Sequence, residues 1–194
     1  MPQRLHDKSA MNPSLIHVLT IGHSTRSLEE FAGLLKSHSV DRLVDVRTMP
    51  RSRHNPQFNG DALAKSLESY GIGYSHFPGL GGLRSTKADS SNTGWHNASF
   101  RAYADYMQTA EFTDNLERLI AIAQHEQVAL MCAEAVPWRC HRSLIADALL
   151  VRNISVEEIL SNTRCESHKL TAFAHVAGTS ITYPPMEPTQ AELF

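Results

Sequence analysis

The sequence predicts an α/β fold: a single, doubly wound parallel sheet of about five strands with helices on both faces. Short apolar runs of strand length alternate with amphipathic segments of helical spacing along most of the chain. With 194 residues, the chain is long enough for one domain with a sizeable core. We expect this domain to span residues 15–183, between a disordered leader (1–14) and a Pro-rich tail (184–194).

The strands are predicted from short segments that are apolar or rich in β-branched residues. These segments are His17–Ile21, Arg42–Val46, Ile72–Phe77, Val128–Met131 and Ile154–Leu160. Residues 172–185 then suggest a small C-terminal hairpin. Crossovers in a parallel sheet are right-handed, so the loops that follow the strands gather at one edge. Side chains that are distant in sequence should therefore meet in one cleft at that edge.

The helices are predicted from apolar residues at helical spacing between the strands. Their expected starts are Ser27, Asn59 or Asp61, Ser99, and Ser143. The first start is a capping box, because Glu30 follows Ser27 by three residues. The third helix extends to about Gln127, and breaks are expected near Thr109 and Thr113. The order of elements is therefore the βαβ alternation of a parallel sheet.

Composition excludes several functional classes. The formal net charge of −2 gives no overall attraction to nucleic acid or to an anionic membrane. No apolar run reaches the roughly 18 residues that a membrane span needs, so no membrane partner is expected. The leader lacks the apolar core of a signal peptide. The three cysteines, an odd number, indicate reduced thiols in a cytoplasmic protein.

Residues 128–149 contain the best candidate for an active site. They read as a strand, a loop that Pro137 keeps from being helical, and a helix. Such a unit presents loop side chains above the carboxyl edge of a sheet. Two thiols, an imidazole, a carboxylate and two guanidinium groups crowd into the loop and its ends: Cys132, Glu134, Arg139, Cys140, His141 and Arg142.

The candidate catalytic residues are Cys132, Glu134, His141 and His23. Cys132 is either a nucleophile activated by the following helix start or a small buried apolar residue. Glu134 is either a general acid or base or half of a salt bridge within the loop. His23 follows the first strand, where it could shuttle protons or fix the loop by hydrogen bonding.

A metal site is an alternative reading of the same loop. Cys132, Cys140 and His141 could bind Zn or Fe, because thiolate sulfur and imidazole nitrogen are ligands of both metals. Their spacing matches none of the usual metal-ligand patterns. The cofactor therefore stays open between no cofactor and one transition metal ion.

The predicted loops are rich in arginine, the side chain best suited to fork-shaped recognition of phosphate or carboxylate. The candidate anion-binding residues are Arg47, Arg51, Arg53, Arg84, Arg139 and Arg142. The alternative for the segment around Arg51 and Arg53 is a solvated, charged loop. Its proline, serine and asparagine residues favour fixed turns, which argues for arginines held in place.

Several motifs together resemble a bacterial family, domain of unknown function 488. They are TIGHST (Thr20 to Thr25), LVDVR with PRSR (Leu43 to Arg53), YSHFPGLGGLR (Tyr74 to Arg84), NTGW (Asn92 to Trp95), FRAYADYM (Phe100 to Met107) and LMCAE with CHR (Leu130 to Arg142). The resemblance covers about His17 to Tyr183. It implies an α/β fold, and it supplies no settled activity.

A weaker resemblance is to rhodanese-like and protein-phosphatase-like domains. Those domains also have a strand that ends in Asp-x-Arg and a later strand, cysteine loop and helix; Asp45, Arg47 and Cys132 fit that outline. The loop departs from it, since it contains Pro137 and no glycine, and Arg139 lies one position too late. Because the fit is only partial, a rhodanese-like thiol enzyme is an alternative function rather than the main prediction.

The last five residues, Gln-Ala-Glu-Leu-Phe, resemble a short peptide by which bacterial replication and repair proteins dock on the sliding clamp. Gln190, Leu193 and Phe194 match its fixed positions, after a Pro-rich spacer. A chance match is the alternative, because five-residue motifs are common. The resemblance implies a sliding clamp as a partner.

Together these features predict an enzyme that acts on an anionic ligand, a phosphate-bearing nucleotide or nucleic acid, through a Cys/Glu/His/Arg cleft. DNA repair or nucleotide modification is the expected setting. The alternative from another class is a non-catalytic module that binds nucleic acid through the same arginines and is recruited by its tail.

Overall fold

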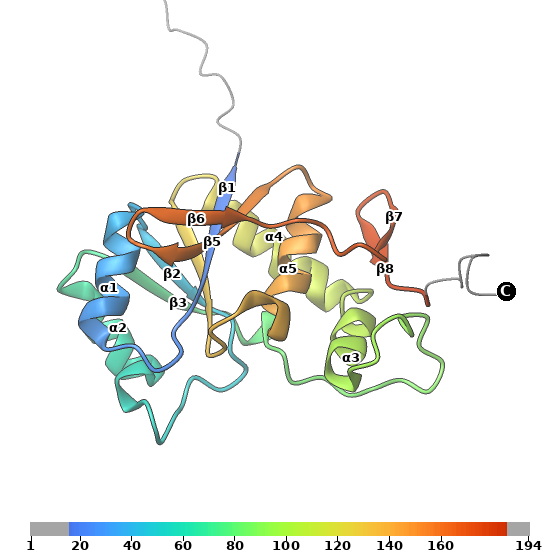
Figure 1. Ribbon diagram of the computed structural model, residues 1–194, viewed down its shortest axis with the longest axis horizontal. Coiled ribbons are helices and arrows are strands. Elements are labelled where there is room, and N and C mark those ends of the chain that lie inside the picture. Colours follow the sequence, from blue (N-terminus) through green and yellow to red (C-terminus); the bar gives the residue numbers. More distant parts are fainter. Residues whose placement is uncertain (1–15, 186–194) are drawn as a thin grey trace, which may run out of the picture.

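A computed structural model describes residues 16–185, which are built around one mixed β-sheet (Figure 1). Its strands are β1 (His17–Gly22), β2 (Arg42–Asp45), β3 (Gly73–His76), β4 (Val128–Cys132), β5 (Ser155–Ser161) and β6 (Arg164–Ser167). Their order across the sheet is β3-β2-β4-β1-β5-β6. Strands β1 to β5 run parallel, and β6 pairs antiparallel with β5 at one edge.

Helices cover both faces of the sheet, and β4 shows why. Its residues Leu130 and Cys132 pack into one apolar cluster, whereas Ala129 and Met131 pack into another on the opposite face. The helices are α1 (Leu28–Ser37), α2 (Gly60–Glu68), α3 (Ala98–Tyr106), α4 (Ala110–Ala123) and α5 (Arg142–Leu150). The first two cover the Met131 face, and the other three cover the Cys132 face (Figure 1).

The predicted α/β class, with a largely parallel sheet between two helical layers, is confirmed. Each predicted strand lies within two residues of an observed one. The sixth strand, β6, was not predicted, because its residues are exposed or half-buried on an edge and show no apolar alternation. The small hairpin is present as β7 (His175–Ala177) and β8 (Ser180–Thr182).

The long third helical segment divides into α3 and α4 at Thr109. The Thr109 hydroxyl accepts a hydrogen bond from the backbone N–H of Phe112 at 3.2 Å, which caps α4. The break expected near Thr113 is wrong, because Thr113 lies inside α4. Its hydroxyl donates to the carbonyl of Thr109, a bond that a helix tolerates.

Some predictions concern residues that the structure does not describe. The leader, and the docking residues Gln190, Leu193 and Phe194, lie outside residues 16–185. Within the described range, no helix is both long enough and apolar enough to cross a membrane.

The topology creates a crevice between β1 and β4, which are neighbours in the sheet. The chain leaves β1 toward α1 on one face, and it leaves β4 toward α5 on the other face. Loops that diverge in this way open a gap at the carboxyl ends of the two strands, where ligands of α/β proteins bind.

A candidate active site at the carboxyl edge of the sheet

The loops after β1, β2 and β4 enclose a cavity of about 680 Å³ at this crevice. Residues 82–83 and 99–100 complete its wall. Side chains from separate strands therefore meet as the topology predicts, and His23, Arg47 and Cys132 all line the one cavity.

Two thiols and one imidazole lie together in the cavity wall, and we call them the sulfur–imidazole centre (Cys132, Cys140, His141). Cys132 is the last residue of β4, whereas Cys140 and His141 immediately precede α5. The Nδ1 atom of His141 lies 4.0 Å from Cys132 Sγ and 3.7 Å from Cys140 Sγ. Both thiols are buried, with 8% and 3% of their surface exposed.

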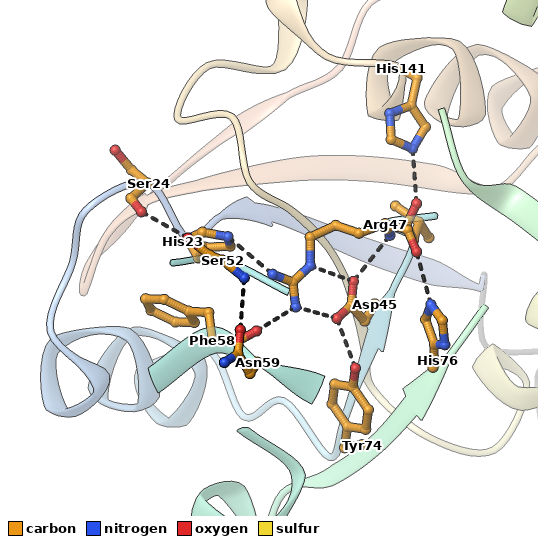
Figure 2. A network of polar contacts seen from close by, with 11 residues as sticks. His23, Ser24, Asp45, Arg47, Ser52, Phe58, Asn59, Tyr74, His76 and His141 are labelled. Carbon is orange, nitrogen blue, oxygen red and sulfur yellow. Dashed lines mark hydrogen bonds and ion pairs between the residues drawn. The ribbon is translucent and has the colours of Figure 1, made fainter. Parts of the chain in front are cut away.

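A backbone contact fixes the orientation of the His141 ring. Its Nε2 lies 3.1 Å from the carbonyl oxygen of Val46, just after β2 (Figure 2). Because a carbonyl only accepts hydrogen bonds, Nε2 carries the proton and Nδ1 presents its lone pair to the two sulfurs. The ring also packs against Tyr103 of α3, with 5.1 Å between ring centres.

The two thiols form a hydrogen-bonded pair, so ionisation of one opposes ionisation of the other. The hydrogen bond from Cys132 lowers the pKa of Cys140, and the nearby Arg142 guanidinium adds to this effect against the opposing effect of burial. The same bond, followed by burial, raises the pKa of Cys132. The directions of these shifts favour Cys140 over Cys132 as the thiol that ionises first, whereas the sequence argument placed the nucleophile at Cys132.

Arg47 lines the cavity, but its charge is already paired. Its Nε and Nη2 donate to the two carboxylate oxygens of Asp45 at 2.9 and 2.5 Å. Nη2 also donates to the carbonyl of Phe58 at 2.7 Å, and Tyr74 donates to the same carboxylate at 2.8 Å (Figure 2). Together, the hydrogen bonds of Arg47 and Tyr74 to Asp45 and of Arg47 to Phe58 connect the ends of β2 and β3 to the loop before α2.

His23 is buried next to Arg47 and is not open to solvent. Its ring stacks on Phe58 at 4.2 Å, and its Nδ1–H donates to the carbonyl of Ser24 at 2.8 Å. Its Nε2 accepts from Arg47 Nη1 at 3.3 Å. Burial, more than the neighbouring cation, lowers the pKa of His23 from 6.5 to about 4. His23 is therefore neutral at physiological pH, with both ring nitrogens engaged.

The six candidate anion-binding arginines differ in whether their guanidinium group faces the cavity and is free to bind an anion. Arg51 and Arg139 are exposed, line the cavity, and form no ion pair among the described residues. Arg47 is paired as described above, and Arg53 is exposed but outside the cavity lining. Arg84 and Arg142 are not part of the cavity lining and bind backbone carbonyls of the loops instead.

Arg84 and Arg142 stabilise the loops around the cavity through these hydrogen bonds. Arg84 donates to the carbonyls of Gly81 and Gly79 at 3.0 and 2.8 Å, with its guanidinium over the Tyr106 ring. Arg142 is fully buried and pairs with Glu158 at 3.2 Å. It also donates to the backbone carbonyl of Glu134 at 2.9 Å, which fixes the loop, while the Glu134 side chain stays exposed at the cavity.

Sequence reasoning missed three contributors to this cavity. Gly82 lies against the imidazole, since a Cβ there would be 2.6 Å from His141 Nδ1. Gly82 belongs to the motif YSHFPGLGGLR, but its position beside His141 depends on tertiary structure. Met49 and Leu83 are each 68% exposed at the cavity, and nothing in their local sequence distinguishes them from ordinary loop residues.

The family model described as "Domain of unknown function DUF488" matches residues 27–149, well over half of the chain. The chain belongs to the DUF488 family. The matched range contains Arg47 and the whole sulfur–imidazole centre, whereas β1 and His23 precede it. No curated protein and no solved structure shows significant similarity to the chain.

The cleft of this DUF488 domain therefore has two zones. The floor carries the sulfur–imidazole centre, which can attack an electrophile or bind a soft metal ion. The rim carries two free guanidinium groups (Arg51, Arg139) and two exposed apolar side chains (Met49, Leu83). Such a rim suits a ligand that has both an anionic group and an apolar or aromatic part.

Proposed function

We propose that this DUF488 protein is an enzyme that acts on a phosphate-bearing nucleotide or nucleic-acid end, as in DNA repair or nucleotide modification. The observation that supports this most is the position of the sulfur–imidazole centre in a cavity of about 680 Å³ with an arginine-bearing rim. A cavity of this size matches the usual range for small-molecule and cofactor sites.

The rim supports a nucleotide over a simple anion. Arg51 and Arg139 can each form charge-assisted hydrogen bonds with phosphate oxygens, because no carboxylate within the described residues pairs with them. Met49 and Leu83 offer apolar surface at the same mouth, and Phe100 contributes to the lining. A nucleobase would cover that apolar surface while its phosphate contacts the arginines.

The floor supports chemistry over binding alone. Two buried thiols and an imidazole of fixed tautomer are unusual in a surface that only recognises a ligand. The exposed carboxylate of Glu134 lines the same cavity, where it is available as a general acid or base.

Binding can be tested with a matched pair of arginine variants. Arg51→Ala and Arg53→Ala remove the same charge from the same loop, but only Arg51 lines the cavity. We expect Arg51→Ala to weaken binding of a fluorescent nucleoside monophosphate or short single strand roughly tenfold, as for one lost charge-assisted hydrogen bond. Arg53→Ala should change Kd less than twofold. Equal weakening by both would indicate nonspecific attraction and contradict the proposal.

Catalysis needs a separate test. Candidate nucleotides and oligonucleotides with terminal phosphates are incubated with the protein, and products are identified by mass spectrometry. We expect turnover by the wild type, its loss in Cys140→Ser, and unchanged ligand affinity in that variant. A wild type that binds the ligand and converts none of the panel would favour the non-catalytic binding module.

A further inference from the structure

We infer that the sulfur–imidazole centre is a site for one divalent transition metal ion, zinc by ligand type. Its protein ligands are Cys132 Sγ, Cys140 Sγ and His141 Nδ1, and its fourth position opens to the cleft. What the ion would do rests on the proposed function, whereas the site itself rests on the geometry below.

The separations of the three ligand atoms fit a tetrahedral ion. Zn–S bonds of about 2.3 Å and Zn–N bonds of about 2.0–2.1 Å place sulfur and nitrogen ligands about 3.6 Å apart. The observed S···N separations are 3.7 Å for Cys140 and 4.0 Å for Cys132, and all three atoms lie within 4.8 Å of one another. Ligation therefore requires the two S···N separations to shorten by only tenths of an ångström.

The imidazole is already set up as a ligand. Its Nε2–H donates to the carbonyl of Val46, and this is the second contact that metal-binding histidines usually make. The contact leaves Nδ1 as the only nitrogen with a free lone pair, and Nδ1 is the atom that faces both sulfurs. A histidine that served merely to fill space would not need this tautomer.

Gly82 leaves room for the imidazole beside the cavity. A Cβ on that residue would lie 2.6 Å from His141 Nδ1, so any larger side chain would crowd the ligand set. Gly82 and all three ligands line the cavity, through which water or substrate can reach the ion. Within the described residues the cluster contains three ligands, and three plus an open position is the arrangement of catalytic zinc sites.

Ligand type and burial favour a metal over a free nucleophile. Two thiolates and one imidazole form a soft donor set that suits zinc or iron and disfavours magnesium or calcium. A sulfur that attacked substrate directly would need exposure, yet Cys132 and Cys140 are almost completely buried. When bound, such an ion would supply a Lewis acid that polarises a water or a substrate oxygen at its open position.

The metal content of the intact, untagged protein tests this inference. We expect elemental analysis to find about one zinc or iron per chain, or one after reconstitution with Zn²⁺. Cys132→Ser, Cys140→Ser and His141→Gln should each lose at least nine-tenths of it. Cys165→Ser is the matched control, because Cys165 also lies beside a histidine, with Sγ 3.4 Å from His38 Nδ1 but outside the centre. It should keep its metal.

Two further measurements keep all three ligands in place, so they do not depend on whether a ligand variant folds. Wild-type protein loaded with Co²⁺ should show sulfur-to-cobalt charge-transfer absorption, which requires no substitution. Gly82→Ala keeps all three ligands, and we expect it to weaken Zn²⁺ affinity at least tenfold in competition with a chelating dye. No stoichiometric metal, no charge-transfer band and fast alkylation of Cys132 and Cys140 would overturn the inference.

The outcome for the metal is separable from that for the proposed function. Nucleotide conversion by a protein that binds no metal would refute the metal site and leave the enzyme proposal standing. A stoichiometric metal in a protein that binds no nucleotide would refute the enzyme proposal and support the metal site.

Discussion

His23 is buried beside a cation, and this placement makes the stability of the fold depend on pH. The pKa of His23 falls from 6.5 to about 4, chiefly because only 3% of its surface is exposed. Between these two pH values the unfolded chain binds more protons than the folded chain, so stability is lost as pH falls. The loss from this one group should reach about 2 kcal/mol at pH 5.

Urea unfolding at pH 7 and pH 5 measures this effect. We expect His23→Gln to be less stable than wild type at pH 7 but to lose less between the two pH values. His54→Gln, a change at an exposed loop histidine, should lose as much as wild type. Identical pH dependence in His23→Gln and wild type would show that His23 accepts its proton freely in the fold.

The buried Arg142–Glu158 pair stabilises the fold only while both partners are present. Arg142 has no exposed surface, and Glu158 is 6% exposed and also accepts a hydrogen bond from Thr20. We expect Glu158→Gln to cost about 3–5 kcal/mol in urea unfolding, because it leaves a buried guanidinium without its counter-ion. Removing both charges, in Arg142→Met with Glu158→Gln, should cost less than Glu158→Gln alone.

A surface ion pair provides the comparison. Glu117 pairs with Arg152 at 3.3 Å but is 57% exposed, so Glu117→Gln should cost about 1 kcal/mol or less. Similar costs for Glu158→Gln and Glu117→Gln would mean that water reaches the Arg142 side chain, contrary to its burial.

At the level of elements, β1 must end in glycine because the loop after β4 folds over it. A Cβ at Gly22 would lie 1.8 Å from the backbone oxygen of Glu134. Gly22→Ala should therefore displace the loop that carries the sulfur–imidazole centre and cost about 1–3 kcal/mol. Gly33→Ala is the matched control, since Gly33 is exposed in α1 with nothing near its Cβ.

The two alanine variants should move the melting temperature in opposite directions. Gly33→Ala should stabilise the protein by up to about 1 kcal/mol, because alanine favours helix over glycine. Gly22→Ala should lower the melting temperature and also weaken nucleotide binding. A Gly22→Ala protein as stable as wild type would show that the loop has room to move away from β1.

The local sequence pattern predicted most helices and strands, and each wrong or missing prediction has a physical reason. The five parallel strands carry apolar residues that the sequence shows directly, and the Ser27 cap predicts the start of α1. Strand β6 has no such signal, because backbone pairing with β5 holds it and none of its residues is buried. Thr113 looked like a helix break, yet its hydroxyl bonds within α4.

At the level of the whole molecule, the sequence predicted that several of the candidate residues meet, but not what each one does there. Parallel topology alone brings His23, Arg47 and Cys132 to one edge. Charge pairing is different, since it depends on side chains far apart in the chain. Glu158 on β5 neutralises the charge of Arg142, and Gly82 makes room for His141. Neither contact can be predicted from the residues next to it in the sequence.

Residues 190–194 carry the prediction of a macromolecular partner. We expect the full chain to bind a bacterial sliding clamp with a Kd on the order of micromolar, typical of a short peptide that orders on docking. Replacing Leu193 and Phe194 with alanine should abolish binding and leave the melting temperature unchanged, and Thr189→Ala should do neither. Surface plasmon resonance on immobilised clamp measures this. A lowered melting temperature without any clamp binding by wild type would contradict it.

One buried carboxylate on α5 accepts hydrogen bonds from three residues that flank the C-terminal hairpin. Asp147 of α5 has no exposed surface and accepts hydrogen bonds from Tyr183 at 2.8 Å, from the Thr171 hydroxyl at 2.6 Å and from His168 at 2.8 Å. Tyr183 also binds Asn92 through its backbone N–H at 2.8 Å, which connects the hairpin to the loop before α3. Asp147 thus supplies three of the side-chain hydrogen bonds of segment 168–183, beside the contacts of this segment with Asn92 and Gln108.

We therefore expect Asp147→Asn to release this segment while the sheet persists. An amide in place of the carboxylate turns an NH₂ group toward at least one of the donors, and each buried donor left unsatisfied costs about 1–3 kcal/mol. Hydrogen exchange should quicken roughly tenfold or more in residues 168–183, with β1 and β4 still protected. Asp114→Asn, on the exposed side of α4, should leave both regions unchanged. Faster exchange in β1 and β4 as well would mean that the hairpin and the sheet unfold as one unit.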